Sequence, residues 1–327
     1  MKAVVATRSG GPEVLEVQDV PPPRPGEKDV IVNVEAAGVN FADLLGMQGR
    51  YAGGPQPPYT PGREFAGTTE AGERVMGYTE YGAFAEQIAA PRHRLWPMPD
   101  GFTAVQAAAF PVNFFTAFFA YWEAGLVERA PDWELRFPGG RRPRVLIHAV
   151  AGGVGTAAVQ IGNCLGVETY GTASTDAKIQ GAFALGLDHG IVYTRQDYLA
   201  LIKEHTQGEG VDAVFESIGG EETARSIRAM GFLGRCILFG SSSGSPAQFD
   251  ARELYAKAQS VWGLWLSRLS ARPEPMRMAA RYLTQWVEEG KLKPVIGHTL
   301  PLEQAAGALR LLAQRKNFGK VVLKVKS

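Results

Sequence analysis

The sequence predicts a protein of the α/β class, in which a β-rich segment precedes a doubly wound parallel sheet. The first 100 residues are dense in glycine and proline, and in the stretch Val30–Glu35 valine occupies every second position, as in a half-buried strand. From about residue 121 onward, strand patterns alternate with helix patterns. Such alternation is typical of a parallel sheet whose strands are joined by crossover helices.

The elements of that sheet are predicted from apolar runs and helical periodicity. We expect strands at residues 145–149, 167–172, 190–193, 211–216, 235–240 and 260–265. Helices are expected between most of them, at 154–166, 176–186, 196–206 and 221–230. Beyond residue 266 the pattern predicts helices at 273–289 and 302–314 and a last strand at 320–325.

Composition excludes several functional classes. The 327 residues are 45% hydrophobic and 20% charged, with a net charge of +1, which suits a globular protein with a substantial core. This balance provides no positive field for nucleic acid or an anionic membrane. No run of about 18 apolar residues is present, the start lacks a signal-peptide pattern, and two cysteines make no disulfide framework. We therefore expect a cytoplasmic protein with no nucleic-acid partner and no membrane span.

The segment Val145–Thr156 is the most informative in the chain. A short apolar run enters a cluster of small residues, and apolar positions from Val154 to Leu165 then follow one helical face. Strand, glycine turn and helix form the context of a dinucleotide fingerprint, because the backbone must approach a pyrophosphate there. Gly152 and Gly155 keep the second and third glycines of that pattern, whereas Val150 replaces the first. The flanking strand and helix favour this interpretation over an ordinary tight turn.

The next predicted strand indicates which dinucleotide is bound. NAD-binding chains carry Asp or Glu about 20 residues after the glycines, where it binds the ribose hydroxyl. Here the strand runs into Gly171–Thr175, with Lys178 one turn on, and Asp176 is interpreted as a first-turn helix residue. A hydroxyl at Ser174 and a lysine suit a 2′-phosphate, which needs donors and positive charge. Although Lys178 alone is typical of a solvated helix lysine, the missing acid favours NADPH over NADH.

Stretches along nearly the whole chain carry a family resemblance. They are Gly38–Asp43, Gln48–Tyr51, Pro61–Glu64, Glu73–Met76, Ala107–Ala117, the fingerprint, Gly171–Ser174 and Lys316–Leu323. Together they resemble the zinc-independent quinone oxidoreductase branch of the medium-chain dehydrogenase/reductase superfamily, and are most similar to vesicle amine transport protein 1 homologues. The resemblance implies a GroES-like catalytic domain over residues 1–120 and 266–327, a Rossmann NADPH-binding domain over 121–265, and a homodimer. Two departures, a short Glu70–Gly72 loop and an inserted Arg129–Arg142 segment, are expected on the surface.

Compared with zinc-dependent relatives, the chain lacks the ligands that hold a metal ion. Asn40 falls near the position of the ligand cysteine and Arg63 at that of the ligand histidine, and the five histidines are scattered. Without a Lewis acid an alkoxide is difficult to stabilise, whereas a quinone or conjugated carbonyl delocalises the charge that hydride addition creates. We therefore predict no metal, and NADPH-dependent hydride transfer to a quinone or enone. An enoyl or alkenal reductase, and a non-catalytic NADPH-binding protein, stay open as alternatives.

The resemblance also implies the site residues. At the acceptor, Asn40 is expected to orient the nicotinamide carboxamide or a substrate oxygen, Tyr51 to donate to a substrate carbonyl, and Asp43 to act through backbone hydrogen bonds. A turn residue at Asn40 and a packed aromatic ring at Tyr51 are the alternatives. Cofactor contacts are implied at Asn40, Thr116, Gly152, Gly153, Val154, Gly155, Ser174, Lys178, Tyr193, Phe239, Gly240, Ser241, Leu264 and Asn317.

Overall fold

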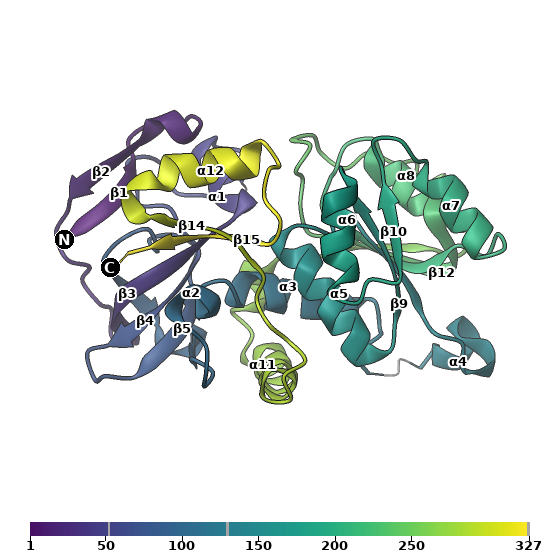
Figure 1. The fold of residues 1–327 in the computed structure, drawn as a ribbon, viewed down its shortest axis with the longest axis horizontal. Helices are drawn as coiled ribbons and strands as arrows, with labels where there is room; N and C mark the ends of the chain where they lie inside the picture. Colours follow the sequence, from purple (N-terminus) through teal and green to yellow (C-terminus); the bar gives the residue numbers. More distant parts are fainter. Residues whose placement is uncertain (52, 129–130, 326–327) are drawn as a thin grey trace. The chain divides into compact units, whose positions relative to one another are not determined.

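The computed structural model describes residues 1–51, 53–128 and 131–325 (Figure 1). Contacts divide the chain into two compact units. The first comprises Met1–Asn113, Ser267–Met278 and Lys293–Ser327, and the second comprises Phe114–Leu266 and Ala279–Leu292. We describe each unit by itself.

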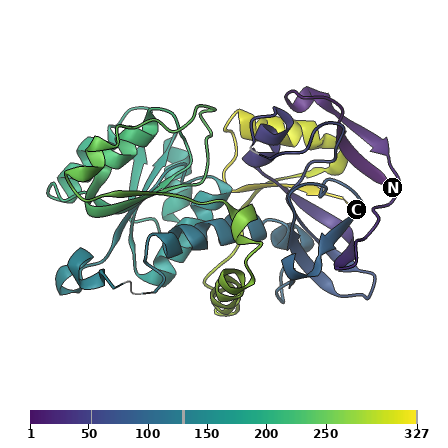
Figure 2. The same ribbon diagram turned by 180° about the vertical axis from the view of Figure 1, so that it is seen from behind.

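A seven-stranded sheet of order β14-β15-β3-β4-β5-β7, with β6 paired to β3, forms the framework of the first unit. Its strands are β3 (Asp29–Val39), β4 (Glu64–Thr69), β5 (Arg74–Tyr78), β6 (Gln87–Pro91), β7 (Leu95–Pro97), β14 (Ile296–Pro301) and β15 (Lys320–Lys324). A separate hairpin pairs β1 (Lys2–Ala6) with β2 (Leu15–Asp19), so the first and last strands of the chain share this unit (Figure 2). The first unit also contains helices α2 (Ala104–Ala107) and α12 (Ala305–Ala313), most of α10 (Leu266–Leu269), and the 3-10 turns η1 (Pro12–Val14), η2 (Arg92–Arg94) and η4 (Leu302–Gln304).

The valine pattern of β3 has the predicted consequence. Val32 and Val34 are fully buried in the core of the first unit, while Asn33 and Glu35, which alternate with them, are only partly buried. Antiparallel pairing of β3 with β15, β4 and β6 surrounds this strand on both edges. Strand β3 ends at Val39 and therefore leads the backbone directly to Asn40.

A short helix, α1 (Phe41–Met47), interrupts the segment that the sequence predicts as β-rich. It begins directly after Asn40, whose backbone N–H donates to the Asp43 carboxylate at 2.8 Å. An acidic side chain at this position satisfies a backbone donor that the helix leaves unpaired. The local capping pair explains why this glycine- and proline-rich region still contains a helix.

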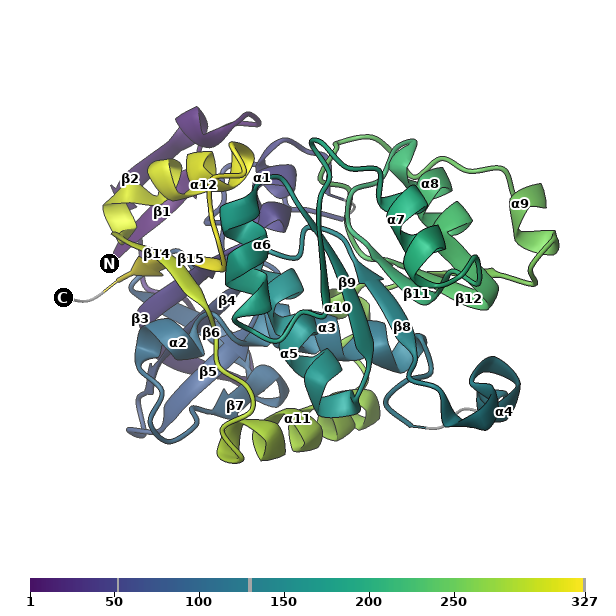
Figure 3. The ribbon, with the colours of Figure 1, turned by 45° about the vertical axis from the view of Figure 1, so that its right-hand side comes forward.

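The second unit contains a six-stranded parallel sheet of order β10-β9-β8-β11-β12-β13, as the sequence predicts. Its strands are β8 (Arg144–Ile147), β9 (Glu168–Ala173), β10 (His189–Val192), β11 (Val211–Glu216), β12 (Met230–Leu238) and β13 (Ser260–Gly263). Its helices are α3 (Pro111–Glu123), α4 (Trp133–Arg136), α5 (Gly153–Leu165), α6 (Asp176–Phe183), α7 (Tyr198–His205), α8 (Glu222–Ala229) and α9 (Arg252–Tyr255), with the 3-10 turn η3 (Pro138–Gly140). Helix α6 packs against β9 and β10 (Figure 3).

Helix α11 (Pro273–Glu288) is divided between the two units. Its later part belongs to the second unit because its aromatic rings meet α3. The ring of Phe118 lies 5.6 Å from that of Tyr282 and 6.2 Å from that of Trp286. Helix α3 is divided as well, because the first unit ends at Asn113 and the second begins at Phe114. Residues 279–292 also belong to the second unit.

The inserted segment is only partly a surface loop, which corrects the expectation for Arg129–Arg142. Its residues Arg129 and Ala130 lie outside the described residues. Phe137 is fully buried and Arg136 is 3% exposed, with its guanidinium donating to Ala124 O at 2.8 Å. By contrast, the Glu70–Gly72 turn is exposed as expected.

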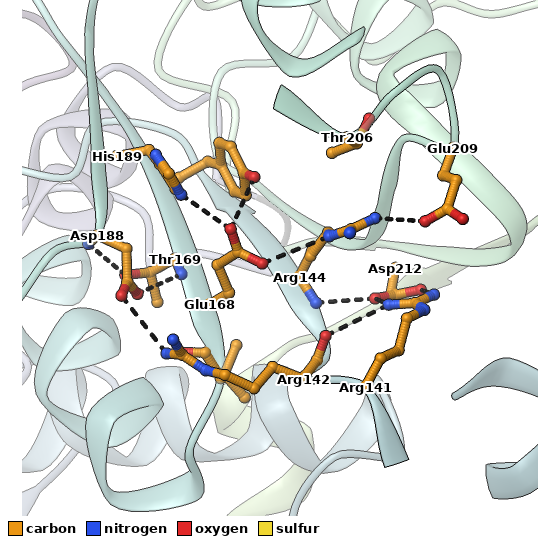
Figure 4. Close-up of polar contacts among 12 residues, drawn as sticks. Arg141, Arg142, Arg144, Glu168, Thr169, Asp188, His189, Thr206, Glu209 and Asp212 are labelled. Atoms are coloured by element: carbon orange, nitrogen blue, oxygen red, sulfur yellow. Dashed lines mark hydrogen bonds and ion pairs between the residues drawn. The ribbon is translucent and has the colours of Figure 1, made fainter. Parts of the chain in front are cut away.

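A network of charges fastens the end of this insertion to the sheet (Figure 4). Arg141 donates both terminal nitrogens to the Asp212 carboxylate, at 2.7 and 2.8 Å, and the Arg144 backbone N–H donates to the same group at 2.8 Å. Arg144 opens β8 and Asp212 is near the start of β11, so the network lies at the amino ends of parallel strands. The insertion therefore contacts the amino ends of the strands, opposite to the carboxyl ends at which each strand enters its following loop.

One helical stretch of the described residues, Ala104–Glu123, is 20 residues long and apolar enough to cross a membrane by length and composition. Within the protein, 78% of the relevant window is buried. A core helix passes the same test, so this stretch is weak evidence for a membrane span.

Candidate functional site: a dinucleotide turn and a buried polar cluster

The glycine turn after β8 has the geometry that a pyrophosphate requires. Gly152 precedes α5 with φ −80° and ψ 175°, and no side chain caps this helix. A Cβ on Gly155 would lie 2.5 Å from Ala149 O and 2.6 Å from Val150 O, so only glycine permits this approach of helix and turn. Gly153 and Val154 supply the first-turn N–H groups, where a helix amino end attracts an anion. The turn therefore fits the phosphates of a dinucleotide.

Ser174, Lys178 and Tyr193 lie in the segments that directly follow β9 and β10. The Tyr193 backbone N–H donates to Ala173 O at 3.1 Å, which joins the two strand ends. Lys178 donates its backbone N–H to the Thr175 hydroxyl at 3.4 Å, in the first turn of α6. Tyr193 is 43% exposed, which argues against a role in core packing.

The remaining residues predicted for the cofactor in this unit follow β12, follow β13 or lie in α3. Phe239 N–H donates to Glu216 O at 3.0 Å, and a Cβ on Gly240 would lie 3.0 Å from Ser217 O. The Ser241 hydroxyl donates to Ser245 O at 2.7 Å. Leu264 and Thr116 are each 6% exposed, the latter within α3.

In the first unit, Asn40 belongs to a buried polar cluster. Its amide nitrogen donates to Glu64 Oε1 at 3.0 Å, and its amide oxygen accepts from Lys320 Nζ at 2.6 Å. Lys320 also forms an ion pair with Glu64, and both side chains are buried. Glu64 in turn accepts the Val112 N–H at 2.8 Å. Asn317, also predicted for the cofactor, donates to Gly319 O at 2.9 Å in the turn before β15.

Asp43 lies beside this cluster and is 3% exposed. It accepts the Asn40 backbone N–H, as expected from the sequence, and Arg63 Nε lies 3.6 Å from its Oδ1. Burial raises the pKa of the Asp43 carboxyl to about 6, although Arg63 and the Asn40 hydrogen bond act in the opposite direction. The carboxyl therefore changes charge close to neutral pH.

Arg63 is a side chain that the sequence did not single out as a site residue. It is 6% exposed, and its guanidinium carbon lies 4.1 Å from the centre of the Tyr51 ring. This cation–π contact and the Asp43 ion pair place Arg63 between two of the predicted acceptor residues. The signal in the sequence was the presence of an arginine where zinc-dependent relatives have a histidine ligand. Among the described residues, no group of three or more His, Cys, Asp or Glu side chains could hold a metal ion.

Comparison with known proteins identifies relatives that cover the chain. The alcohol dehydrogenase GroES-like domain model matches residues 26–100, and the zinc-binding dehydrogenase model matches residues 185–323. The synaptic vesicle membrane protein VAT-1 homolog of Rattus norvegicus is 33% identical, over 99% of this chain and 84% of its own length. The quinone oxidoreductase of Lama guanicoe is 32% identical, over 100% of this chain and 98% of its own length.

Similar solved structures include quinone oxidoreductases in complex with NADPH. The quinone oxidoreductase of Thermus thermophilus, whose structure was also determined in complex with NADPH, has a TM-score of 0.87 at 34% identity, over 99% of this chain and 100% of its own. The Escherichia coli quinone oxidoreductase complexed with NADPH has a TM-score of 0.88 at 27% identity, over 99% of this chain and 100% of its own.

Proposed function

Because the chain belongs to the medium-chain dehydrogenase/reductase superfamily, with quinone oxidoreductases and VAT-1 homologues among its relatives, we propose that it transfers a hydride from NADPH to a quinone or related conjugated carbonyl without a metal ion. These relatives support the more general function of an NADPH-dependent oxidoreductase. The observation that supports the proposal is the glycine turn before α5, where helix and turn approach so closely that only glycine fits at position 155, together with the segment after β9 that carries Ser174 and Lys178.

When bound, NADPH supplies the hydride, and the protein supplies binding and orientation. Gly152, which precedes α5, would allow the backbone to approach the pyrophosphate, and Gly155 allows the helix to pack closely on the turn. Ser174, Lys178 and Tyr193 would hold the adenosine 2′-phosphate through a hydroxyl, an ammonium group and a phenol. These contacts hold the nicotinamide in place, which lowers the entropic cost of the hydride step.

On the acceptor side, the Tyr51 hydroxyl would donate a hydrogen bond to the substrate carbonyl, whose oxygen gains negative charge when the conjugated acceptor takes up a hydride. Arg63 holds the Tyr51 ring by the cation–π contact and contributes positive charge to the same region. Hydride transfer to a conjugated acceptor gives a delocalised anion, so hydrogen bonds and one guanidinium replace the Lewis acid that an alkoxide would need.

The first experiment follows the loss of nicotinamide absorbance when purified protein is mixed with NADPH or NADH and 9,10-phenanthrenequinone. We expect turnover with NADPH to exceed turnover with NADH, and Tyr51→Phe to lower the rate while leaving NADPH affinity unchanged. A 2-alkenal serves as the second acceptor, and faster reduction of it than of the quinone would favour the alkenal reductase alternative. NADPH binding without reduction of either acceptor would favour a non-catalytic role, and absence of binding would contradict the proposal.

A further inference from the structure

We propose that Arg195 is a further determinant of NADPH specificity, because its guanidinium binds the 2′-phosphate and neutralises the nearby Asp176 carboxylate. This inference rests on the NADPH-dependent function proposed above. It adds a residue outside the set predicted from the sequence, and it assigns a role to an acid that stands beside that set.

The two residues meet because neighbouring parallel strands end side by side. Strand β9 ends at Ala173 and leads to Asp176, the first residue of α6, and β10 ends at Val192 and leads to Arg195. The Thr194 hydroxyl donates to Ser174 O at 3.1 Å, so the two loops are joined at the residue predicted to contact the phosphate. Arg195 is therefore fixed at the carboxyl edge of the sheet, close to the proposed phosphate contacts.

Arg195 and Asp176 form a two-pronged ion pair. One terminal nitrogen donates to Asp176 Oδ2 at 2.5 Å and the other donates to Oδ1. The Arg195 hydrogen bonds lower the pKa of the Asp176 carboxyl, which therefore carries its negative charge at neutral pH. Their side chains are 58% and 62% exposed, and an exposed pair of this kind contributes little to folding stability.

The position of Asp176 makes its charge relevant to the cofactor. An acid near the end of this strand favours a ribose hydroxyl and repels a 2′-phosphate. The guanidinium cancels that repulsion, and its planar donors match phosphate oxygens, so it can share its hydrogen bonds between carboxylate and phosphate. The pair thus offsets the negative charge of Asp176, the first residue of α6, and keeps this end of β9 suited to NADPH.

The test compares dissociation constants for NADPH, NADH and 2′,5′-ADP, measured by isothermal titration calorimetry on the full chain. We expect Arg195→Ala to weaken NADPH and 2′,5′-ADP binding by about tenfold, the effect of losing one charged hydrogen bond, and to change NADH binding by less than about twofold. Asp176→Asn keeps the guanidinium and removes the acid, so it should bind NADPH at least as tightly as the unaltered chain. Arg228→Ala, which removes a similarly exposed arginine from its ion pair with Glu253 in the same unit, should change the affinity for neither cofactor.

Equal weakening of NADPH and NADH in Arg195→Ala would overturn the inference. So would a loss of NADPH affinity in Asp176→Asn as large as that in Arg195→Ala, because the pair would then act only as a brace between two loops. Both outcomes leave NADPH binding by the unaltered chain intact, and with it the proposed function. Failure of the unaltered chain to bind NADPH would overturn the function and the inference together.

Discussion

Alanine substitutions at Gly152 and Gly155 should distinguish the role of the fingerprint turn in NADPH binding from its role in folding. At Gly152 an added Cβ would lie 3.2 Å from Ala149 O, and the backbone φ of −80° suits alanine. At Gly155 the same atom would lie 2.5–2.6 Å from three backbone atoms of the turn, which cannot move aside as a flexible side chain can. Gly152→Ala is therefore expected to fold normally, whereas Gly155→Ala is expected to be overpacked.

The magnitudes differ accordingly. Overpacking costs about 1–3 kcal/mol, and each kcal/mol lowers the melting temperature by about 2–4 °C in a domain of this size class. For Gly152→Ala we expect a melting temperature like that of the unaltered chain but an NADPH dissociation constant at least about tenfold higher, equivalent to about 1.4 kcal/mol. The loss follows because the new methyl group occupies space that the pyrophosphate needs.

Calorimetry supplies both readouts, by thermal scanning for stability and by titration for NADPH affinity. Unchanged NADPH affinity in Gly152→Ala would refute the assignment of this turn to the pyrophosphate. A Gly155→Ala variant as stable as the unaltered chain would refute the steric argument.

Three further predictions concern charge. Lys178→Ala should raise the NADPH dissociation constant by about tenfold to a hundredfold with little effect on NADH, and equal losses in titration calorimetry would contradict a phosphate role. Because burial raises the pKa of Asp43 from 3.8 to about 6, the folded chain holds that proton more tightly than the unfolded chain. The stability that the bound proton contributes is present below pH 3.8 and lost by about pH 6. Between these pH values, urea unfolding should therefore show a fall in the free energy of unfolding that is about 3 kcal/mol larger in the unaltered chain than in Asp43→Asn. Parallel plots of the free energy of unfolding against pH would contradict this. Asp212→Ala should lower the free energy of unfolding by at least about 2 kcal/mol, since it leaves Arg141 without its carboxylate. It should leave NADPH affinity unchanged, because Asp212 lies at the amino ends of the strands and the proposed cofactor contacts follow the carboxyl ends. A large loss of NADPH affinity would contradict that placement.

Much of the fold could be predicted because the deciding signals are local. The alternation of Val32 and Val34 and the apolar run Val145–Ile147 are short-range patterns, and the structure confirms the strands they predict. Likewise, the requirement for glycine at position 155 is visible in the sequence, because close backbone approach excludes every other side chain there.

The contacts that complete the site could not be predicted in the same way. Arg63 reaches Tyr51 and Asp43 only after β4 has paired beside β3, and Arg195 reaches Asp176 only through the register of β10 against β9. Such partners depend on tertiary packing, and no periodicity of the chain reports them. The buried part of the insertion was missed for a similar reason, since Arg136 and Phe137 are polar–aromatic neighbours that resemble an exposed loop until the sheet edge covers them.

The buried cluster around Asn40 changes what that residue is expected to do. Its amide oxygen faces the Lys320 ammonium and its amide nitrogen faces Glu64, which fixes the orientation of the side chain from both ends. Lys320 comes from the last strand and Glu64 from β4, so removing either charge would leave the other buried without its partner, a loss of several kcal/mol. The cluster therefore holds Asn40 in place at the start of α1, and its contact with the nicotinamide carboxamide or a substrate oxygen stays a prediction. The proposed contact with the acceptor carbonyl belongs to Tyr51, whose ring Arg63 covers.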